Sequence, residues 1–160
     1  MEYVDEKGER QTPVMLHRAL FGSLERFIGI LIEHYTGKLP AWLSSVQVSV
    51  LTISETFNDY AKCLSHVFDA SGLRVELDDS KDKVGYKIRQ HTLQKVPFMV
   101  IVGANEVEAK TVNLRLLNGK KISFDDIESA LNYLKEACRP PDMLDEEHAI
   151  KSAIQALKTF

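Results

Sequence analysis

Hydrophobic residues follow two different spacings along the middle of the chain, and the spacing changes several times. Apolar residues that alternate with polar ones predict strands buried on one face, and short unbroken apolar runs predict strands covered on both faces. The dipeptide Asn118-Gly119 is a strong hairpin signal. The predicted strands are 46–53, 73–77, 98–102, 111–117 and 121–122, with the hairpin signal between the last two.

Apolar residues three and four positions apart predict helices between these strands. We expect helices over 57–68 and 83–94, a short helical start after Gly103, and a last helix with Ser123 as its N-cap. In the helix over 83–94, the residues expected to face inward are Val84, Ile88 and Leu93. This order of elements predicts an α/β fold, with a mixed, mainly parallel five-stranded sheet flanked by helices.

The first part of the chain is organised differently. Lys7-Gly8-Glu9 predicts a hairpin turn, and 14–16 predicts a short strand. Apolar residues then recur at helical spacing, so we expect a helix over 23–36 with Ser23 as its N-cap. This strand and helix cannot cover their own apolar face, so we expect them to pack on the following domain or on another chain.

Breaks in the pattern divide the chain into three parts. Glycine and proline end the first helix, and a compact domain begins just after them. A second break at Arg139-Pro-Pro-Asp142 precedes a last amphipathic helix, at about 145–159. The predicted boundaries are 1–43, 44–140 and 141–160.

Composition limits the binding partners and the cellular compartment that we expect. The formal net charge of the 160 residues is −3, which does not favour indiscriminate polyanion binding, so any RNA contact must be local, and we expect no DNA partner. The two cysteines, Cys63 and Cys138, are far apart in sequence, which favours reduced thiols in a cytoplasmic protein. No apolar run has membrane-spanning length, and the charged N-terminus is not a signal peptide, so we expect no membrane partner.

Arg26 is unusual for its position in the predicted first helix. If Ser23 is the N-cap, Arg26 lies in the first turn, where unpaired N–H groups already carry partial positive charge. The same N–H groups favour anions, and a guanidinium beside them can bind phosphate with two parallel hydrogen bonds. Arg26 therefore either contacts a polyphosphate or pairs with Glu25.

A basic stretch is the best RNA-facing candidate. Between residues 81 and 95, five positive side chains stand against one negative side chain, a formal charge of +4, and phosphate contact competes with a simple solvated helix face. The positive residues are Lys81, Lys83, Lys87, Arg89 and Lys95. Glu106 follows a strand end, where a carboxylate can accept from guanine, and Arg115 can donate to a base edge. For Glu106 and Arg115 the alternative is a surface ion pair.

The sequence resembles a known family at these positions. Gly22-Ser-Leu-Glu-Arg26 resembles the third signature motif of class II aminoacyl-tRNA synthetases, and the string from Pro13 through Pro40-Ala-Trp-Leu43 is similar to threonyl-tRNA synthetases. The resemblance implies a strand-helix remnant of the catalytic domain over 1–43, then an anticodon-binding domain. It also implies that the full enzyme forms threonyl-tRNA from threonine, ATP and tRNA as a homodimer.

The resemblance assigns roles to individual residues. It places Arg26 and Ser23 at magnesium-bound ATP, and His17 at zinc as one of three ligands, of which the other two are missing here. It places Glu106 and Arg115 at the middle and last anticodon bases of threonine tRNA. It places Lys95 at a basic position of the same site. No cofactor is expected in this chain alone, and without the first two class II motifs the chain is expected to be inactive.

The sequence departs from the family pattern at two places and is compatible with two alternative functions. Ser80-Lys81-Asp82 stands where the family commonly has Arg-Asn-Glu, and Leu116-Leu117-Asn118 stands where relatives often carry further basic residues. Both departures affect the expected strength of anticodon binding. The alternative functions are a free-standing RNA-binding or regulatory module and a flavodoxin-like domain that binds a small ligand.

Overall fold

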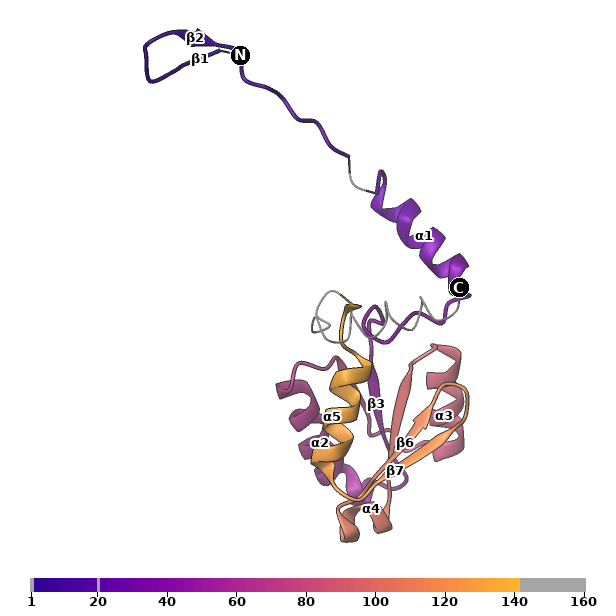
Figure 1. The fold of residues 1–160 in the computed structure, drawn as a ribbon. Coiled ribbons are helices and arrows are strands. Elements are labelled where there is room, and N and C mark those ends of the chain that lie inside the picture. Colours follow the sequence, from indigo (N-terminus) through magenta and orange to yellow (C-terminus); the bar gives the residue numbers. More distant parts are fainter. Residues whose placement is uncertain (1, 20, 142–160) are drawn as a thin grey trace, which may run out of the picture.

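The computed structural model describes residues 2–19 and 21–141. Figure 1 shows an α/β domain with an N-terminal segment that extends away from it. The segment contains a hairpin of β1 (Tyr3–Val4) and β2 (Arg10–Gln11), followed by α1 (Leu24–His34). The remaining elements belong to the domain.

The domain is built on one five-stranded sheet in the order β4-β3-β5-β6-β7. Its strands are β3 (Val48–Thr52), β4 (Val75–Asp78), β5 (Phe98–Val102), β6 (Val112–Leu116) and β7 (Lys121–Phe124). Strand β3 is parallel to both β4 and β5, whereas β6 is antiparallel to β5 and β7. The predicted mixed sheet is thus confirmed, with β3 and β5 almost wholly buried, as their apolar runs require.

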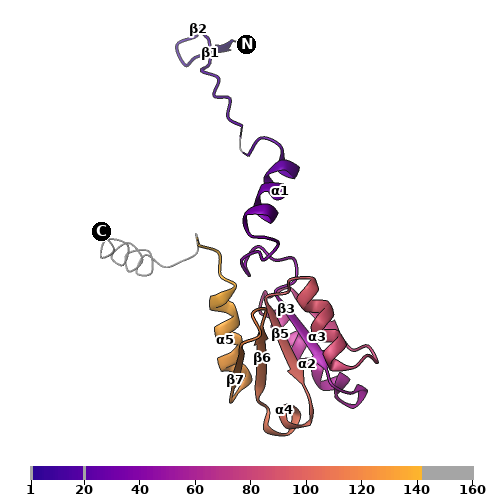
Figure 2. The ribbon, with the colours of Figure 1, turned by 90° about the vertical axis from the view of Figure 1, so that its right-hand side faces the viewer.

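Helices cover the sheet unequally. The helical elements are η1 (Glu55–Phe57), α2 (Asn58–Ala70), α3 (Val84–Leu93), α4 (Ala104–Ala109) and α5 (Ile127–Ala137). Helices α2 and α5 pack on one face, where Phe68 and Leu134 join Val50 and Val100 in the main core. Helix α3 packs on the other face, over β3 (Figure 2).

Strand register decides which side chains share the face of α3. Directly paired residues point to the same side of a sheet, so Met99 and Arg115 share this face, as do Ile101 and Asn113. Leu51 and Met99 are fully buried, but Asn113 and Arg115 are only partly buried and Lys121 is exposed. We call the part of this face formed by Ile101, Asn113, Arg115, Lys121 and Ser123 the open half of the sheet.

A linker joins the N-terminal segment to the sheet and is held by two side chains. The Arg74 guanidinium donates to the carbonyl oxygens of Trp42 and Ser44, at 2.8 and 2.9 Å. Gln47 is buried, donates to the carbonyl of Ala41 and accepts from the backbone N–H of Arg74. These hydrogen bonds fix the path of the linker against β4.

The N-terminal segment confirms some predictions and contradicts others. Ser23 caps α1 by accepting from the N–H of Arg26, and Gly8 lies in the predicted hairpin turn. The predicted strand at 14–16 is wrong: these residues are 81–91% exposed and pair with no described strand that could satisfy their backbone groups. Helix α1 has no buried residue, so it does not pack on the following domain.

Three further predictions about the domain are wrong. Ser123 lies in β7, and Asp126 caps α5 instead, accepting from the N–H of Ser129 at 2.6 Å. Leu93, expected to face inward, is 63% exposed. Lys87, counted as a surface charge, is 1% exposed. The predicted helix at about 145–159 lies outside the described residues.

Within 2–19 and 21–141, no helix combines the length and apolarity needed to cross a bilayer.

Candidate nucleic-acid interface

A pocket of about 230 Å³ lies on the open half of the sheet. Its lining residues are Ile101, Glu106, Asn113, Leu114, Arg115 and Lys121. Glu106 comes from the first turn of α4, directly after the carboxyl end of β5, and Arg115 comes from β6. The structure therefore brings these two predicted site residues into one pocket.

Both oxygens of the Glu106 carboxylate are hydrogen-bonded. Oε2 accepts from the backbone N–H of Gly103 at 2.9 Å, which is the capping contact of α4. Oε1 accepts from the side-chain amide of Asn113. A Cβ at Gly103 would lie 2.6 Å from Ile53 Cδ1 and 3.0 Å from Glu106 Oε2, so a side chain there would have to displace the end of the Ile53 side chain.

The surroundings of Glu106 are partly shielded from water. Burial, reinforced by the negative charge of Glu106, raises the pKa of Tyr60 above its ordinary value. The Tyr60 hydroxyl is buried and has no hydrogen-bond partner among the described residues. Electrostatic contacts made by Glu106 therefore operate in a less screened environment than those of a fully exposed carboxylate.

Arg115 is held differently. Its Nε is buried and has no partner in the described part of the chain, although Nη2 lies close to Gly119 in the β6–β7 turn. A buried N–H without a partner is uncommon. Arg115 as a whole is only partly buried and lines the pocket, so it is the accessible part of its side chain that a ligand there can contact. With Lys121 exposed beside it, the pocket holds two cations and one carboxylate.

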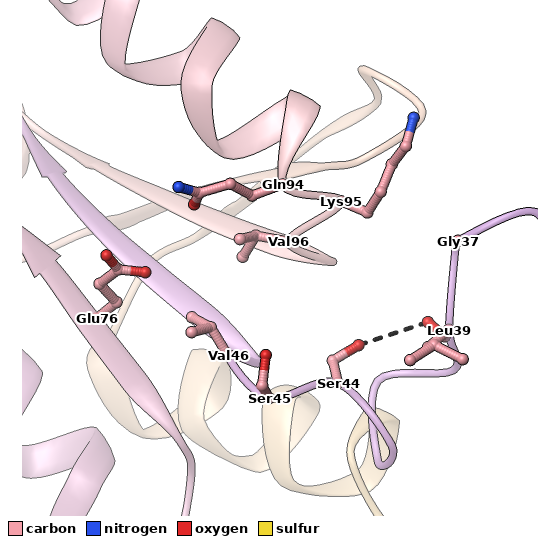
Figure 3. Close-up of a pocket in the computed structure, with 9 residues that line it drawn as sticks. All are labelled: Gly37, Leu39, Ser44, Ser45, Val46, Glu76, Gln94, Lys95 and Val96. Carbon is pink, nitrogen blue, oxygen red and sulfur yellow. Dashed lines mark hydrogen bonds between the residues drawn. The ribbon is translucent and has the colours of Figure 1, made fainter. Parts of the chain in front are cut away.

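Lys95 lines a different pocket, of about 310 Å³, at the end of α3 (Figure 3). In Figure 3 its ammonium points away from Glu76 and Val46, which line the other side. Lys95 adopts φ +62°, the left-handed conformation at the end of a helix that glycine usually occupies. The N–H of Val96 donates to the carbonyl of His91 and that of Lys95 to Thr92, which closes α3.

The two other predicted basic residues are separate from both pockets. Lys81 is exposed and pairs with Glu55 at 3.1 Å, near the carboxyl ends of β3 and β4. Arg89 is exposed on α3. Since Lys87 is buried, the surface charge of the 81–95 stretch is +3 rather than the predicted +4.

Lys87 instead belongs to a buried polar cluster that the sequence analysis missed. Its Nζ donates to the carbonyl and hydroxyl oxygens of Thr52, both at 3.1 Å, and to the carbonyl of Asp78 at 3.0 Å. His91 lies between Ser49 Oγ and the Asp78 carboxylate, at 3.0 and 3.2 Å. The four-residue spacing of Lys87 and His91, on one face of a helix, was the available signal.

Asp78 is ionised within this cluster. Burial raises its pKa, but hydrogen bonds from Ser80 and His91 and the charge of Lys87 more than compensate, so its pKa lies below the ordinary value. The cluster is therefore internally satisfied and does not offer a free group to a ligand.

The predicted site residues of the N-terminal segment are exposed. Ser23 Oγ donates to the Glu25 carboxylate at 2.6 Å, which lowers the pKa of Glu25, and Arg26 is exposed beside it. His17 is exposed, and no group of three or more potential metal-binding side chains occurs in the described ranges. A zinc site at His17 would therefore need ligands from beyond these residues.

The chain is similar to known proteins over most of its length. The sequence model of the family described as "Anticodon binding domain" matches residues 47–137. A threonine–tRNA ligase from Dichelobacter nodosus is 47% identical over 134 residues, covering 84% of this chain and 21% of that protein. A threonine–tRNA ligase from Halorhodospira halophila is 53% identical over 133 residues, covering 83% of this chain and 21% of that protein.

A solved structure extends the comparison to the fold. The RNA binding domain of threonyl-tRNA synthetase from Cryptosporidium parvum Iowa II superposes with a TM-score of 0.71 at 33% identity. The match covers 78% of this chain and 31% of that chain. The chain spans about a fifth of the length of the curated relatives it matches.

Proposed function

Because the chain belongs to the anticodon binding domain family, we propose that it recognises the anticodon of threonine tRNA, as the C-terminal portion of a threonine–tRNA ligase. The family match covers more than half of the 160 residues. Curated threonine–tRNA ligases at 47–53% identity support the choice of tRNA. These matches do not favour a flavodoxin-like domain or a free-standing regulatory module.

The observation that carries this proposal is the pocket shared by Glu106 and Arg115. A carboxylate accepts two parallel hydrogen bonds from the N1–H and N2–H₂ groups of guanine, the middle base of threonine anticodons. The Arg115 guanidinium, which also lines this pocket, donates to the carbonyl edge of the last anticodon base. Two groups in one pocket can reach two neighbouring unstacked bases of one loop.

Basic residues around the pocket supply the contacts that are independent of sequence. Lys121 lies in the pocket, whereas Lys95, Arg89 and Lys81 lie outside it. Their role in the proposal is to bind phosphates on either side of the anticodon, which positions the RNA without reading it. Lys81 does so only by exchanging its ion pair with Glu55 for a phosphate.

The same proposal covers the rest of the molecule. Residues 1–43 would be the end of a catalytic domain and 44–140 the anticodon-binding domain, with the remainder of the synthetase and a second copy as partners. In the full enzyme Ser23 and Arg26 would bind magnesium-bound ATP, and His17 would bind zinc with two ligands from elsewhere. The exposed apolar residues of α1, including Leu24 and Ile28, suit a segment that packs in a larger unit.

We also propose a cytoplasmic location, because free thiols are typical of a reducing compartment. Cys63 and Cys138 are free thiols, and burial raises the pKa of Cys138 to about 11, so it is an unreactive core residue.

RNA binding tests the proposal directly. The full chain should bind an RNA stem–loop carrying a threonine anticodon more tightly than stem–loops in which the middle or last anticodon base is changed. Glu106→Ala and Arg115→Ala should each lower this preference about 10–100-fold, the range of a good base contact. Equal binding of all stem–loops, or variants that bind like the wild type, would refute the site assignment.

Catalysis tests the part of the proposal that concerns the whole enzyme. The chain alone should not exchange pyrophosphate into ATP in the presence of threonine, because its ATP-binding residues are exposed on an isolated helix. Threonine-dependent exchange by the purified chain would show that the catalytic part is sufficient here, against our expectation.

A further inference from the structure

Two polar side chains of the open half have no role in the proposed function. Asn113 lies in β6, two positions before Arg115, and Ser123 lies opposite Asn113 on β7. The Asn113 amide donates to Glu106 Oε1, and the Ser123 hydroxyl donates to Asn113 Oδ1 at 2.6 Å. Together with the Gly103 N–H, these groups form a continuous hydrogen-bonded chain across three elements.

The chemistry of these groups fixes which one donates and which one accepts in each hydrogen bond. An ionised carboxylate only accepts, so Asn113 must present its NH₂ group to Glu106. Asn113 Oδ1 is then left to accept, and the hydroxyl of Ser123 must donate to it. The Ser123 hydroxyl therefore orients the amide, and the amide orients the carboxylate.

We propose that Asn113 and Ser123 are positioning residues that set the plane of the Glu106 carboxylate for base reading, an inference that rests on the proposed function. The Gly103 N–H alone holds one oxygen and leaves the carboxylate free to rotate about it. The bond from Asn113 holds the second oxygen. With one lone pair of each oxygen engaged, the remaining pairs can face two parallel donors, which is the arrangement that the edge of guanine requires.

The position of Asn113 explains why it acts through Glu106. Asn113 lies at the wall of the pocket and is only partly exposed, and both ends of its amide are already used. Asn113 has one remaining N–H that it can offer to RNA. Its hydrogen bond to the Glu106 carboxylate is charge-assisted and is therefore the stronger contact. Its main effect on recognition is therefore expected to depend on the presence of the carboxylate.

The experiment measures binding of two stem–loop RNAs that carry the threonine anticodon with guanine or with inosine in the middle. Inosine lacks the N2 amino group, so the ratio of the two affinities reports the two-donor contact with Glu106. Asn113→Ala should lower this ratio about tenfold, the order of one charge-assisted hydrogen bond. Ser123→Ala should lower it less. The matched control is Asn132→Ala, an exposed asparagine on α5, which should leave the ratio unchanged.

A double-mutant cycle separates this inference from the proposed function. In the Glu106→Ala background, Asn113→Ala should have no further effect on the ratio. If Glu106→Ala itself leaves the ratio unchanged, the proposed function fails. If Glu106→Ala lowers the ratio and Asn113→Ala does not, or if Asn113→Ala lowers it equally without Glu106, only the positioning role is overturned.

A second variant gives a pH signature that a structural role would not produce. Asn113→Asp places a second carboxyl beside Glu106, and two neighbouring carboxyls raise the pKa of one of them. Guanine preference should be lost at neutral pH and recover as the pH falls, as a shared proton restores the donor. The wild type should not change in this way. A ratio for this variant that stays flat with pH, with folding verified by circular dichroism, would contradict the inference.

Discussion

The two halves of one sheet face carry similar polar side chains but use them in opposite ways. Under α3, Lys87, His91 and Asp78 are hydrogen-bonded to one another or to β3, and Lys87 is 1% exposed. On the open half, Glu106 and Arg115 face a pocket, and Arg115 Nε has no partner among the described residues. The difference is the helix: where it covers the sheet, the polar groups are buried and satisfied, and where it is missing they line a pocket that is open to a ligand.

The largest effect is expected for the half of the sheet face under α3, which we call the covered half. Lys87→Met should lower the free energy of unfolding by about 3–5 kcal/mol, because it removes the charge paired with the Asp78 carboxylate and leaves the acceptors on Thr52 without their buried donor. Urea unfolding measures this change. Lys83→Met, at an exposed position of the same helix end, is the control and should change stability by less than about 0.5 kcal/mol. Equal effects of the two changes would mean that the cluster does not support the fold.

The pH dependence of stability tests the role of Asp78 in the same half. The pKa of Asp78 is lowered in the folded state, so its charged form contributes stability above its unfolded pKa of about 3.9, and this contribution is lost as the pH falls through the lower folded value. Asp78→Asn should therefore be destabilising at neutral pH, by less than Lys87→Met because the Asp78 side chain is more exposed. The difference from the wild type should shrink below about pH 3.9. A difference that is constant between neutral and acidic pH would contradict this assignment.

On the open half, a substitution should weaken RNA binding and leave the stability of the protein nearly unchanged. Arg115→Met should lower affinity for the threonine anticodon stem–loop by about 10–100-fold while leaving the free energy of unfolding within about 1 kcal/mol of the wild type. The physical reason is that the buried Nε gains little in the free protein, so its removal costs little there. Parallel binding and unfolding measurements decide the matter, and a loss of stability as large as that of Lys87→Met would remove the contrast between the halves.

The smallest expected effect concerns Lys95, at the end of α3. Lys95→Gly should raise the free energy of unfolding by about 1 kcal/mol, because only glycine adopts φ +62° without strain. The same change should weaken RNA binding and reduce the slope of log K against log salt by about 0.7, the value for one phosphate contact on a single strand. Lys95→Ala separates the two effects, since it loses the charge and keeps the strain. If Lys95→Gly changes neither stability nor the salt slope, Lys95 has no part in the site.

Much of the fold could be predicted because local signals and burial agree. The unbroken apolar run of β5 and the alternation of β6 both predict the observed strands, and Asn118-Gly119 predicts the hairpin that joins β6 to β7. These strand and hairpin predictions need only the spacing of residues along one element or between two neighbouring ones. For Glu106 and Arg115, the strand end and the strand face made each residue a candidate, whereas the family resemblance placed the two in one site.

The failures have a common physical cause. Lys87 and His91 are buried by partners on β3 and β4, which are remote in sequence, so their own polarity predicts exposure. Two good capping residues, Ser123 and Asp126, lie three positions apart, and the continuation of β7 decides between them. The apolar residues at 14–16 have a strand-like sequence but no neighbouring strand to pair with in the described structure.

The linker contacts of Arg74 have a mechanical consequence. One guanidinium bound to the carbonyls of Trp42 and Ser44 prevents the chain from swivelling where it enters the sheet. This entry point lies at the amino end of β3, whereas Glu106 follows the opposite end of β5. An RNA loop bound at the pocket would thus lie one strand length from the point where any preceding polypeptide is attached. The domain would keep this separation fixed.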